Sequence, residues 1–429
     1  MTEDLLHFIW QYKLLKPVSY YTTQNNRLEI IRCGEHNKDA GPDFTHARIK
    51  IDDTEWAGTV EIHKKSSDWF LHQHDTNKAY DNVILHVVYE HDKEIYNSRQ
   101  QLIPCLELKP ILIDDVISKY QNLYQSKQQI PCGSLFTEVA AITRESCLDR
   151  MLFERLEAKT DFIKELYHYT KNNWEETFYL LLFKNFGFHT NSDAFLQIAK
   201  TIPLTVLLKH ANSITQVEAL LFGQSGLLDK TLKDAYGKGL LKEYEYLKHK
   251  YSLTPIPHHL KFLRLRPQNF PTIRIAQLAN FVAKYQHTFS KIVESNSVDE
   301  IKKLFAISVS EYWQSHYVFD EESIFKDKDL GNLSIENIII NTVCPLLFFY
   351  GKEKQDESII DKAVKWYDEL KPERNKFIKL FEELKFKPKH AGHSQALLQL
   401  YANYCSPKKC LVCNIGVSIL SKNNRRDLS

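Results

Sequence analysis

The pattern of apolar and polar positions in the first hundred residues predicts a small module that mixes helices and strands. Apolar residues recur at helical spacing over residues 3–15, whereas residues 47–51 and 56–63 alternate between apolar and polar side chains. Residues 83–89 form a nearly continuous apolar run, typical of a strand covered on both faces. The predicted order is a helix over 3–15, strands over 28–31, 47–51 and 56–63, a helix that begins near Ser67, and a strand over 83–89.

From about Phe136 onward the pattern becomes helical. The helix-like segments cover residues 178–183, 219–228, 240–251, 274–285 and 359–384. The apolar stretch from Ile338 to Tyr350 is too short to span a bilayer, so we expect a buried helix and no membrane contact. We therefore predict an α+β protein with an α/β module over 1–130 and a helical domain over 131–429, which includes the C-terminal cysteines.

Composition narrows the class of protein. The chain has 429 residues, and 56 Lys and Arg against 54 Asp and Glu give a formal net charge of +2. The hydrophobic fraction of 43% excludes a largely disordered chain, and the near-zero net charge argues against a protein coated in positive charge. The 8 cysteines are too few for a disulfide scaffold at this length, and the N-terminus lacks the pattern of a signal peptide. We expect a cytoplasmic protein.

Acidic residues and a histidine gather on the predicted hairpin. Asp43 precedes one strand, and Glu61 and His63 share one face of the next. If Asp52 and Asp53 close a two-residue turn, an unbroken register pairs Asp43 with Ile62. A bulge between Asp43 and Ala47 would instead bring Asp43 beside Glu61. Two carboxylates at that separation can hold one divalent cation, although a solvated sheet face is the alternative.

The order of elements and the Pro42-Asp43 and Glu61-x-His63 pairs resemble the PD-(D/E)xK phosphodiesterase superfamily, which includes restriction enzymes and RecB-type nucleases. The resemblance covers residues 3–90. It implies that Asp43 and Glu61 bind Mg²⁺ or Mn²⁺ and that the residue at position 63 orients water. His63 replaces the lysine of that motif, a departure that bears on activity rather than on fold.

The whole chain also resembles a bacterial family, widespread in Bacteroidota, that is known only as a domain of unknown function. The segments that carry this resemblance are Gly41–Phe44, Val60–His63, Ser67–Trp69, Tyr80–His86, Arg266–Pro271 and Tyr404-Cys405. This resemblance supplies no activity. The interpretation of the site therefore depends on its chemistry.

Further histidines accompany the hairpin. His72 and His74 lie on or just beyond the predicted helix, where residues two apart do not face each other, although on a loop the two could hold Zn²⁺. His86 lies within the apolar run, where a hydrogen-bonded core histidine is the common case.

Three cysteines cluster near the C-terminus. Cys405, Cys410 and Cys413 form a C-x4-C-x2-C pattern beside Lys408 and Lys409, which we expect to favour thiolates. A closed metal site needs a fourth ligand, and the candidates are Cys132, Cys344, His390 and His393. Some RecB-like nucleases hold an iron–sulfur cluster with one early and three late cysteines, and this resemblance favours Cys132. The site would then hold zinc or an iron–sulfur cluster; three free thiols are the alternative.

These patterns support competing functions. The leading hypothesis is a metal-dependent nuclease that uses Asp43, Glu61 and His63. Basic segments at residues 264–274, which include Arg274, and 371–390 would contact nucleic acid, although solvated helix faces are the ordinary meaning of such segments. The alternatives are a non-enzymatic scaffold that binds nucleic acid or protein, and a protein whose activity resides in the cysteine cluster.

Overall fold

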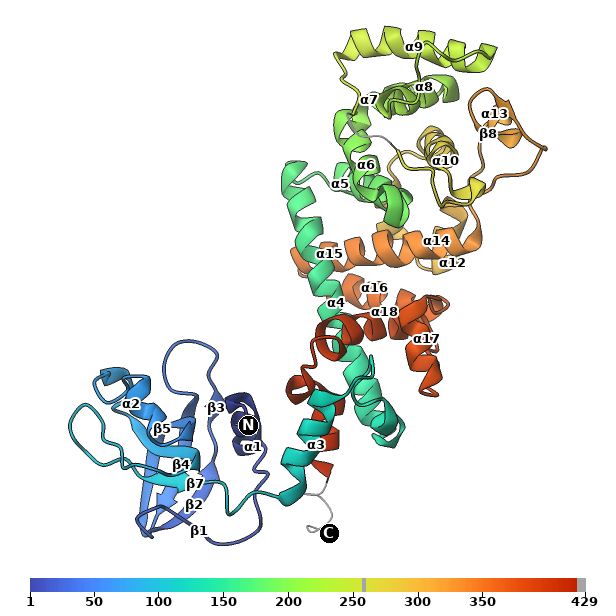
Figure 1. Ribbon diagram of the computed structural model, residues 1–429. Coiled ribbons are helices and arrows are strands. Elements are labelled where there is room, and N and C mark those ends of the chain that lie inside the picture. The colour runs from blue at the N-terminus through green and yellow to red at the C-terminus, as the bar shows by residue number, and fades with distance from the viewer. Residues whose placement is uncertain (257–259, 423–429) are drawn as a thin grey trace. The chain divides into compact units, whose positions relative to one another are not determined.

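The computed structural model describes residues 1–256 and 260–422 and divides into two compact units. Unit 1 contains residues 1–147, 383–386 and 400 onward, and unit 2 contains residues 148–382 and 387–399. The N-terminal part is α/β with a mixed sheet, and most of the remaining chain is helical (Figure 1). The predicted α+β class is confirmed at this level. The predicted boundary at residue 130 lies inside unit 1 and stays a prediction.

Unit 1 is built on a mixed sheet whose strands lie in the order β1-β2-β4-β5-β6-β7, with β3 paired to β4. The pairs from β1 to β5 are antiparallel, whereas β5–β6 and β6–β7 are parallel. The strands are β1 (Tyr20–Tyr21), β2 (Arg27–Arg32), β3 (Glu35–His36), β4 (Phe44–Ile51), β5 (Thr54–Lys65), β6 (Val83–Glu90) and β7 (Cys105–Glu107). The four predicted strands correspond to β2, β4, β5 and β6. The short strands β1, β3 and β7 were not predicted.

The β4–β5 hairpin has the predicted turn and the bulge that brings its acidic residues together. Ile51 pairs with Thr54, and Asp52 adopts the left-handed conformation that closes the turn, with φ of 50°. The register shifts between Phe44 and Ala47, where His46 is also left-handed with φ of 56°. Phe44 consequently pairs with Val60.

Helices cover the sheet and connect its parallel strands. Helix α1 (Glu3–Gln11) buries Leu6 and Ile9, and its N-terminus is capped by the Thr2 hydroxyl, which accepts from the backbone N–H of Leu5. Helix α2 (Asp68–Leu71) and the 3₁₀ turn η1 (Lys78–Tyr80) lie between β5 and β6. Trp69 of α2 is fully buried in a cluster with Tyr80, Val83, Ile95 and Ile103.

The rest of unit 1 is helical and includes the C-terminal segment. Its elements are α3 (Asp114–Gln125), η2 (Gly133–Glu138), the start of α4 (Ala141–Tyr169), the π-helix η5 (Tyr401–Cys405), η6 (Cys410–Val412) and α19 (Asn414–Leu420). Helix α19 contacts α3, and α1 contacts η6. The C-terminal cysteines therefore group with the N-terminal module.

Unit 2 is a helical assembly with one small hairpin. It comprises the remainder of α4 and α5 (Trp174–Phe186), α6 (Phe188–Thr201), α7 (Leu204–Lys209), α8 (Ile214–Gln224), α9 (Ala235–Tyr251), η3 (Pro267–Asn269), α10 (Pro271–Lys284), α11 (Thr288–Glu294), α12 (Val298–Leu304), α13 (Glu311–Gln314), β8 (His316–Val318), β9 (Glu321–Glu322), α14 (Asn332–Ile338), η4 (Ile339–Val343), α15 (Cys344–Lys354), α16 (Glu357–Glu369), and nearly all of α17 (Lys376–Glu383) and α18 (Ala391–Leu400). The segment predicted as one helix over 359–384 forms two helices, α16 and α17. The helical conformation is interrupted around Pro372, which cannot continue an α-helix.

The apolar stretch near residue 340 is a core helix, as predicted. Elements α14, η4 and α15 form one continuous helix, Asn332–Lys354, whose length and composition would suffice to cross a membrane. Within the protein, 72% of its most apolar window is buried. A core helix of a folded domain accounts for this burial. The predicted cytoplasmic location stays a prediction.

Candidate functional site

The bulged hairpin brings Asp43 and Glu61 side by side. The backbone N–H of Asp43 donates to Glu61 Oε2 at 3.0 Å, and the backbone N–H of Ile62 donates to Asp43 Oδ2 at 2.9 Å. Each carboxylate is thus fixed by the backbone of the opposite strand. The Asp43 side chain retains 23% of its exposure, whereas Glu61 retains 6%. The two residues that the sequence singled out therefore meet in the fold.

Helix α1 adds a histidine that the sequence argument did not select. His7 Nε2 lies 3.1 Å from Asp43 Oδ2. Burial disfavours a charged imidazole, but the hydrogen bond and negative charge of Asp43 outweigh burial and raise the pKa of His7. Burial likewise opposes ionisation of Asp43, but His7 and the Ile62 N–H hold the pKa of that carboxyl below its usual value. Asp43 therefore favours the charged form of His7, and His7 in turn favours the charged form of Asp43.

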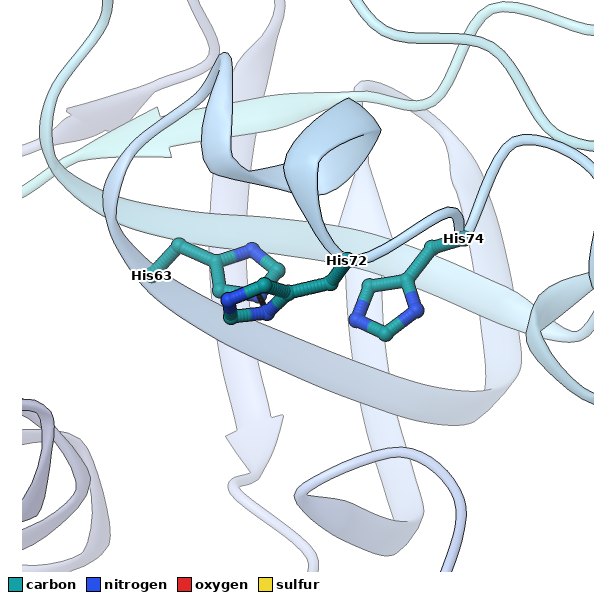
Figure 2. Close-up of side chains that lie close together, drawn as sticks. All are labelled: His63, His72 and His74. Atoms are coloured by element: carbon teal, nitrogen blue, oxygen red, sulfur yellow. Dashed lines mark hydrogen bonds between the residues drawn. The ribbon is translucent and has the colours of Figure 1, made fainter.

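Three histidines face one another beside Glu61 (Figure 2). The ligand nitrogens of His63, His72 and His74 all lie within 4.8 Å of one another. His63 Nε2 is 3.1 Å from His72 Nδ1, and His74 Nε2 is 3.2 Å from Glu61 Oε1. Nε2 of His63 also lies 3.6 Å from the same Glu61 oxygen. Three nitrogens therefore lie close together, and one oxygen of Glu61 lies beside two of them, those of His63 and His74.

The local backbone explains how His72 and His74 come to the same side. Helix α2 ends at Leu71, and Gln73 adopts a left-handed conformation with φ of 59°. The two histidines therefore do not follow helical spacing, which would have directed them apart. The sequence contained the His-x-His signal, but the turn at Gln73 could not be predicted from it.

His86 supports the cluster from β6. His63 Nδ1 lies 2.8 Å from His86 Nε2, and the His86 side chain is fully buried. Burial, followed by the nearby His72 and His74, lowers the pKa of His63 to about 3, and burial also lowers the pKa of His86. Both rings are therefore neutral at pH 7. With the proton of His63 on Nδ1, its Nε2 presents a lone pair to the cluster.

Aromatic side chains hold His74 in place. Its ring stacks on Tyr80 with centroids 3.7 Å apart and meets the face of Trp69 edge-on. Burial raises the pKa of Glu61; the hydrogen bond from His74 acts in the opposite direction, and the charge of Asp43 adds to the increase. The site therefore combines a buried acidic oxygen with preorganised imidazoles.

The arrangement fits a divalent metal ion. Neutral imidazole nitrogens suit Zn²⁺ and other transition metals, whereas carboxylate oxygens suit Mg²⁺ and Mn²⁺. The other ring nitrogen of His63, Nδ1, is hydrogen-bonded to His86. Metal-binding histidines usually have such a hydrogen bond on the nitrogen that does not bind the metal. Within residues 1–256 and 260–422, this histidine group is the one group of three His, Cys, Asp or Glu residues whose ligand atoms all lie within 4.8 Å of one another.

The comparisons with known proteins give a family but no activity. A family model described as "Protein of unknown function (DUF2851)" matches residues 3–376. The chain belongs to this family. Comparisons with curated proteins and with solved structures gave no match. In this member of the DUF2851 family, Asp43, Glu61, the histidines and Cys132 lie within the matched residues, whereas Cys405, Cys410 and Cys413 lie beyond them.

The sequence left four candidates for the fourth ligand of the cysteine cluster. Of these, Cys132 lies with the three C-terminal cysteines. All four thiols are buried, and each interacts electrostatically with the others of the group. Gly416 of α19 packs against the backbone of Cys410, since a Cβ at this position would lie 2.2 Å from the Cys410 carbonyl oxygen. The group is therefore formed by a tightly packed turn.

The expectation that lysines favour thiolates here is wrong for the metal-free protein. Burial raises the pKa of Cys132 to about 12 and that of Cys410 to about 11, and the charge of Lys408 opposes this increase only in part. The Lys408 ammonium instead donates to the backbone carbonyls of Tyr124 and Ser126, at 2.7 and 2.9 Å, at the end of α3.

Proposed function

We propose that this protein is a metal-dependent hydrolase that cleaves phosphodiester bonds in nucleic acid. The observation that carries the proposal is the pairing of Asp43 with Glu61 across the bulged hairpin, directly beside three converging imidazoles. The resemblance of the helix–strand order and of the Pro42-Asp43 and Glu61-x-His63 pairs to PD-(D/E)xK nucleases supports the same reaction class.

Each residue has a role that follows from its environment. Glu61, His63, His72 and His74 would hold the ion, and Asp43 lies beside them as a partly exposed anion. A bound divalent cation supplies activation of water at neutral pH and stabilisation of negative charge on phosphorus. Asp43 favours the charged form of His7, and a charged His7 would attract a phosphate group beside Asp43.

The ligand set also suggests which ion binds. Three nitrogens and one buried carboxylate favour Mn²⁺ or Zn²⁺ over Mg²⁺, which prefers oxygen ligands in octahedral geometry. The sequence had suggested Mg²⁺ or Mn²⁺ on the basis of Asp43 and Glu61 alone. Mn²⁺ is therefore the ion that both arguments share.

A cavity beside the site has features of a strand-binding groove. It has a volume of about 370 Å³ and is lined by residues of α1, β3, α3 and the 407–412 segment, all within unit 1, with Asp4 as its one carboxylate. His7, which contacts Asp43, lies in its wall together with the rings of Tyr120 and Tyr124 and the exposed Lys409. Aromatic rings and a positive charge along one groove are what single-stranded nucleic acid requires.

The test is cleavage of labelled single-stranded and double-stranded DNA and RNA by the full chain with Mn²⁺, Zn²⁺ or Mg²⁺. Asp43→Asn and Glu61→Gln should each abolish cleavage, while the exposed hairpin variant Asp53→Asn should retain it. Cleavage that is equal in all four proteins, or absent with every substrate and ion, would overturn the proposal. Binding of nucleic acid without cleavage, unaffected by Asp43→Asn, would favour the scaffold alternative.

A separate observation supports a metal centre at the cysteines, and we propose that Cys132, Cys405, Cys410 and Cys413 bind it together. Four buried thiols gathered in one place match the ligand number of a closed metal site, and a bound metal or cluster would take their protons. A single Zn²⁺ would hold sulfur atoms about 3.8 Å apart. Four thiolates can hold either one zinc ion or an iron–sulfur cluster, and the spectrum of the protein distinguishes the two.

Anaerobic purification with metal analysis and a visible spectrum tests this second proposal. A brown protein with iron and sulfide would support the cluster, whereas a colourless protein with one zinc per chain would support the single ion. Cys132→Ser should remove either metal, and the buried Cys147→Ser, outside the group, should not. A metal-free wild-type protein would contradict the proposal.

A further inference from the structure

Unit 2 contains a cavity whose wall includes a buried arginine without an acidic partner. The cavity has a volume of about 290 Å³, close to the lower end of the range for small-molecule sites. Arg274 of α10 lies in its wall and is 5% exposed. The sequence had placed Arg274 on a basic surface that meets nucleic acid. Its burial makes that role wrong and raises the question of what balances its charge.

The hydrogen bonds of Arg274 are all to neutral groups. Nη1 donates to Gln277 Oε1 at 2.9 Å, and Nη2 donates to Asn269 Oδ1 at 2.7 Å and to Ser334 Oγ at 3.2 Å. A guanidinium has five N–H donors, so these bonds leave two without a protein acceptor, and the buried Nε is one of them. Burial alone lowers the pKa of Arg274 to about 10, which leaves it charged at pH 7.

The backbone adds positive potential to the same cavity. Three helices begin in its wall: α6 at Phe188, α10 at Pro271 and the long helix Asn332–Lys354. The first turn of each lacks an acidic residue, and none of the three N-termini is capped by a side chain. No acidic side chain of these first turns therefore offsets the positive ends of the three helix dipoles beside the cavity.

The rest of the lining is apolar and aromatic. Phe186 and Phe195 are fully buried, and the Phe188 ring lies 4.6 Å from the Arg274 guanidinium carbon. The lining contains no Asp or Glu. A buried charge without a partner is costly, so an anion supplied from solution would balance it.

We propose that this cavity binds a small anionic molecule, with its phosphate or carboxylate group on Arg274 and the three helix N-termini and its apolar body against the phenylalanines. Arginine pairs with both groups in two-point geometry, so the head group is the property that the test must distinguish. The site lies in unit 2 and does not depend on the proposed hydrolase activity.

The experiment is calorimetric titration of the full chain with phenyl phosphate and with benzoate, which share a ring and differ in the head group. We expect at least one of them to bind the wild type, and Arg274→Gln to weaken this binding about tenfold or more. Arg274→Lys should retain part of the affinity, and Arg266→Gln, an exposed arginine of the same segment, should retain all of it.

A variant at the mouth of the cavity guards against misfolding of Arg274→Gln. Leu333 lines the cavity and is 82% exposed, so Leu333→Trp should fold normally and obstruct entry. Loss of binding in Leu333→Trp, with an unchanged circular dichroism spectrum, would support the assignment. The proposal is overturned if neither probe binds the wild type at millimolar concentration, or if a probe that binds the wild type binds Arg274→Gln or Leu333→Trp as tightly.

Discussion

Two buried carboxyls in this protein differ in what surrounds them. Glu61 lies beside imidazoles and a second carboxylate, which is an environment suited to a cation. Glu218 of α8 is 1% exposed and accepts hydrogen bonds only from the Tyr236 and Ser310 hydroxyls. Burial raises the pKa of Glu218 to about 7, because hydroxyl donors compensate only part of its desolvation. At the scale of the residue, the partners and not the degree of burial distinguish the proposed metal ligand Glu61 from the hydroxyl-bonded Glu218.

The raised pKa of Glu218 predicts how stability depends on pH. The folded state keeps the proton that the unfolded chain releases near pH 4.5, so this stabilisation is present below pH 4.5 and is lost as the pH rises to about 7. Glu218→Gln should remove that loss and make the protein more stable than wild type at pH 8, by up to roughly 3 kcal/mol. Denaturant unfolding of both proteins at pH 5 and pH 8 measures it. A difference that does not change with pH would contradict the prediction.

At the scale of the element, the alternation of apolar and polar residues predicted the β4–β5 hairpin. The bulge and the turn that shape the site depend instead on residues with a left-handed backbone conformation. The Ala47–Ile51 and Trp56–His63 alternations determined β4 and β5, and their register followed from the turn at Asp52. The bulge at His46 and the turn at Gln73 depend on single left-handed residues, which side-chain patterns do not encode. His7 was missed because it lies on a helix far in sequence from the hairpin, and only the fold brings it to Asp43.

The turn at Gln73 gives an element-scale prediction. A left-handed residue favours glycine and strongly disfavours a β-branched side chain. Gln73→Gly should therefore leave Mn²⁺ affinity intact, whereas Gln73→Val should reduce it about tenfold by moving His72 away from His74. Titration of Mn²⁺ into the three proteins measures this effect. Equal affinity in Gln73→Val would show that the turn does not position these histidines.

At the scale of the whole molecule, the chain returns to its first unit at the end. Residues 400–422 pack in unit 1, so the C-terminal cysteines lie with the N-terminal sheet rather than with the helices that precede them in sequence. The predicted boundary rested on a change in the hydrophobic pattern along the sequence. Such a boundary divides the chain in sequence order, so it cannot show that the C-terminal residues pack with the N-terminal unit. The helical spacing of apolar residues after about Phe136 correctly predicted that unit 2 is mainly helical.

Two units with separate cores predict unfolding in two calorimetric transitions. Removal of bound metal by a chelator should lower the midpoint of one transition, because both proposed metal sites lie in unit 1. Glu218→Gln should shift the other transition, because Glu218 lies in unit 2. The division into two units would be contradicted if the chelator and Glu218→Gln shifted the same transition. A single transition under all conditions would contradict it as well.

We propose that Glu61, His63 of β5 and the two histidines of the α2 turn form a metal site. The most direct measurement is titration of the metal-free full chain with Mn²⁺, followed by electron paramagnetic resonance. Mn²⁺ prefers oxygen and nitrogen to cysteine sulfur, so the cysteine cluster should not contribute to the signal, and the site variants assign it. We predict one bound Mn²⁺ per chain, lost in Glu61→Gln and in His72→Ala and retained in Asp53→Asn. Absence of binding, or binding that both site variants retain, would contradict the account.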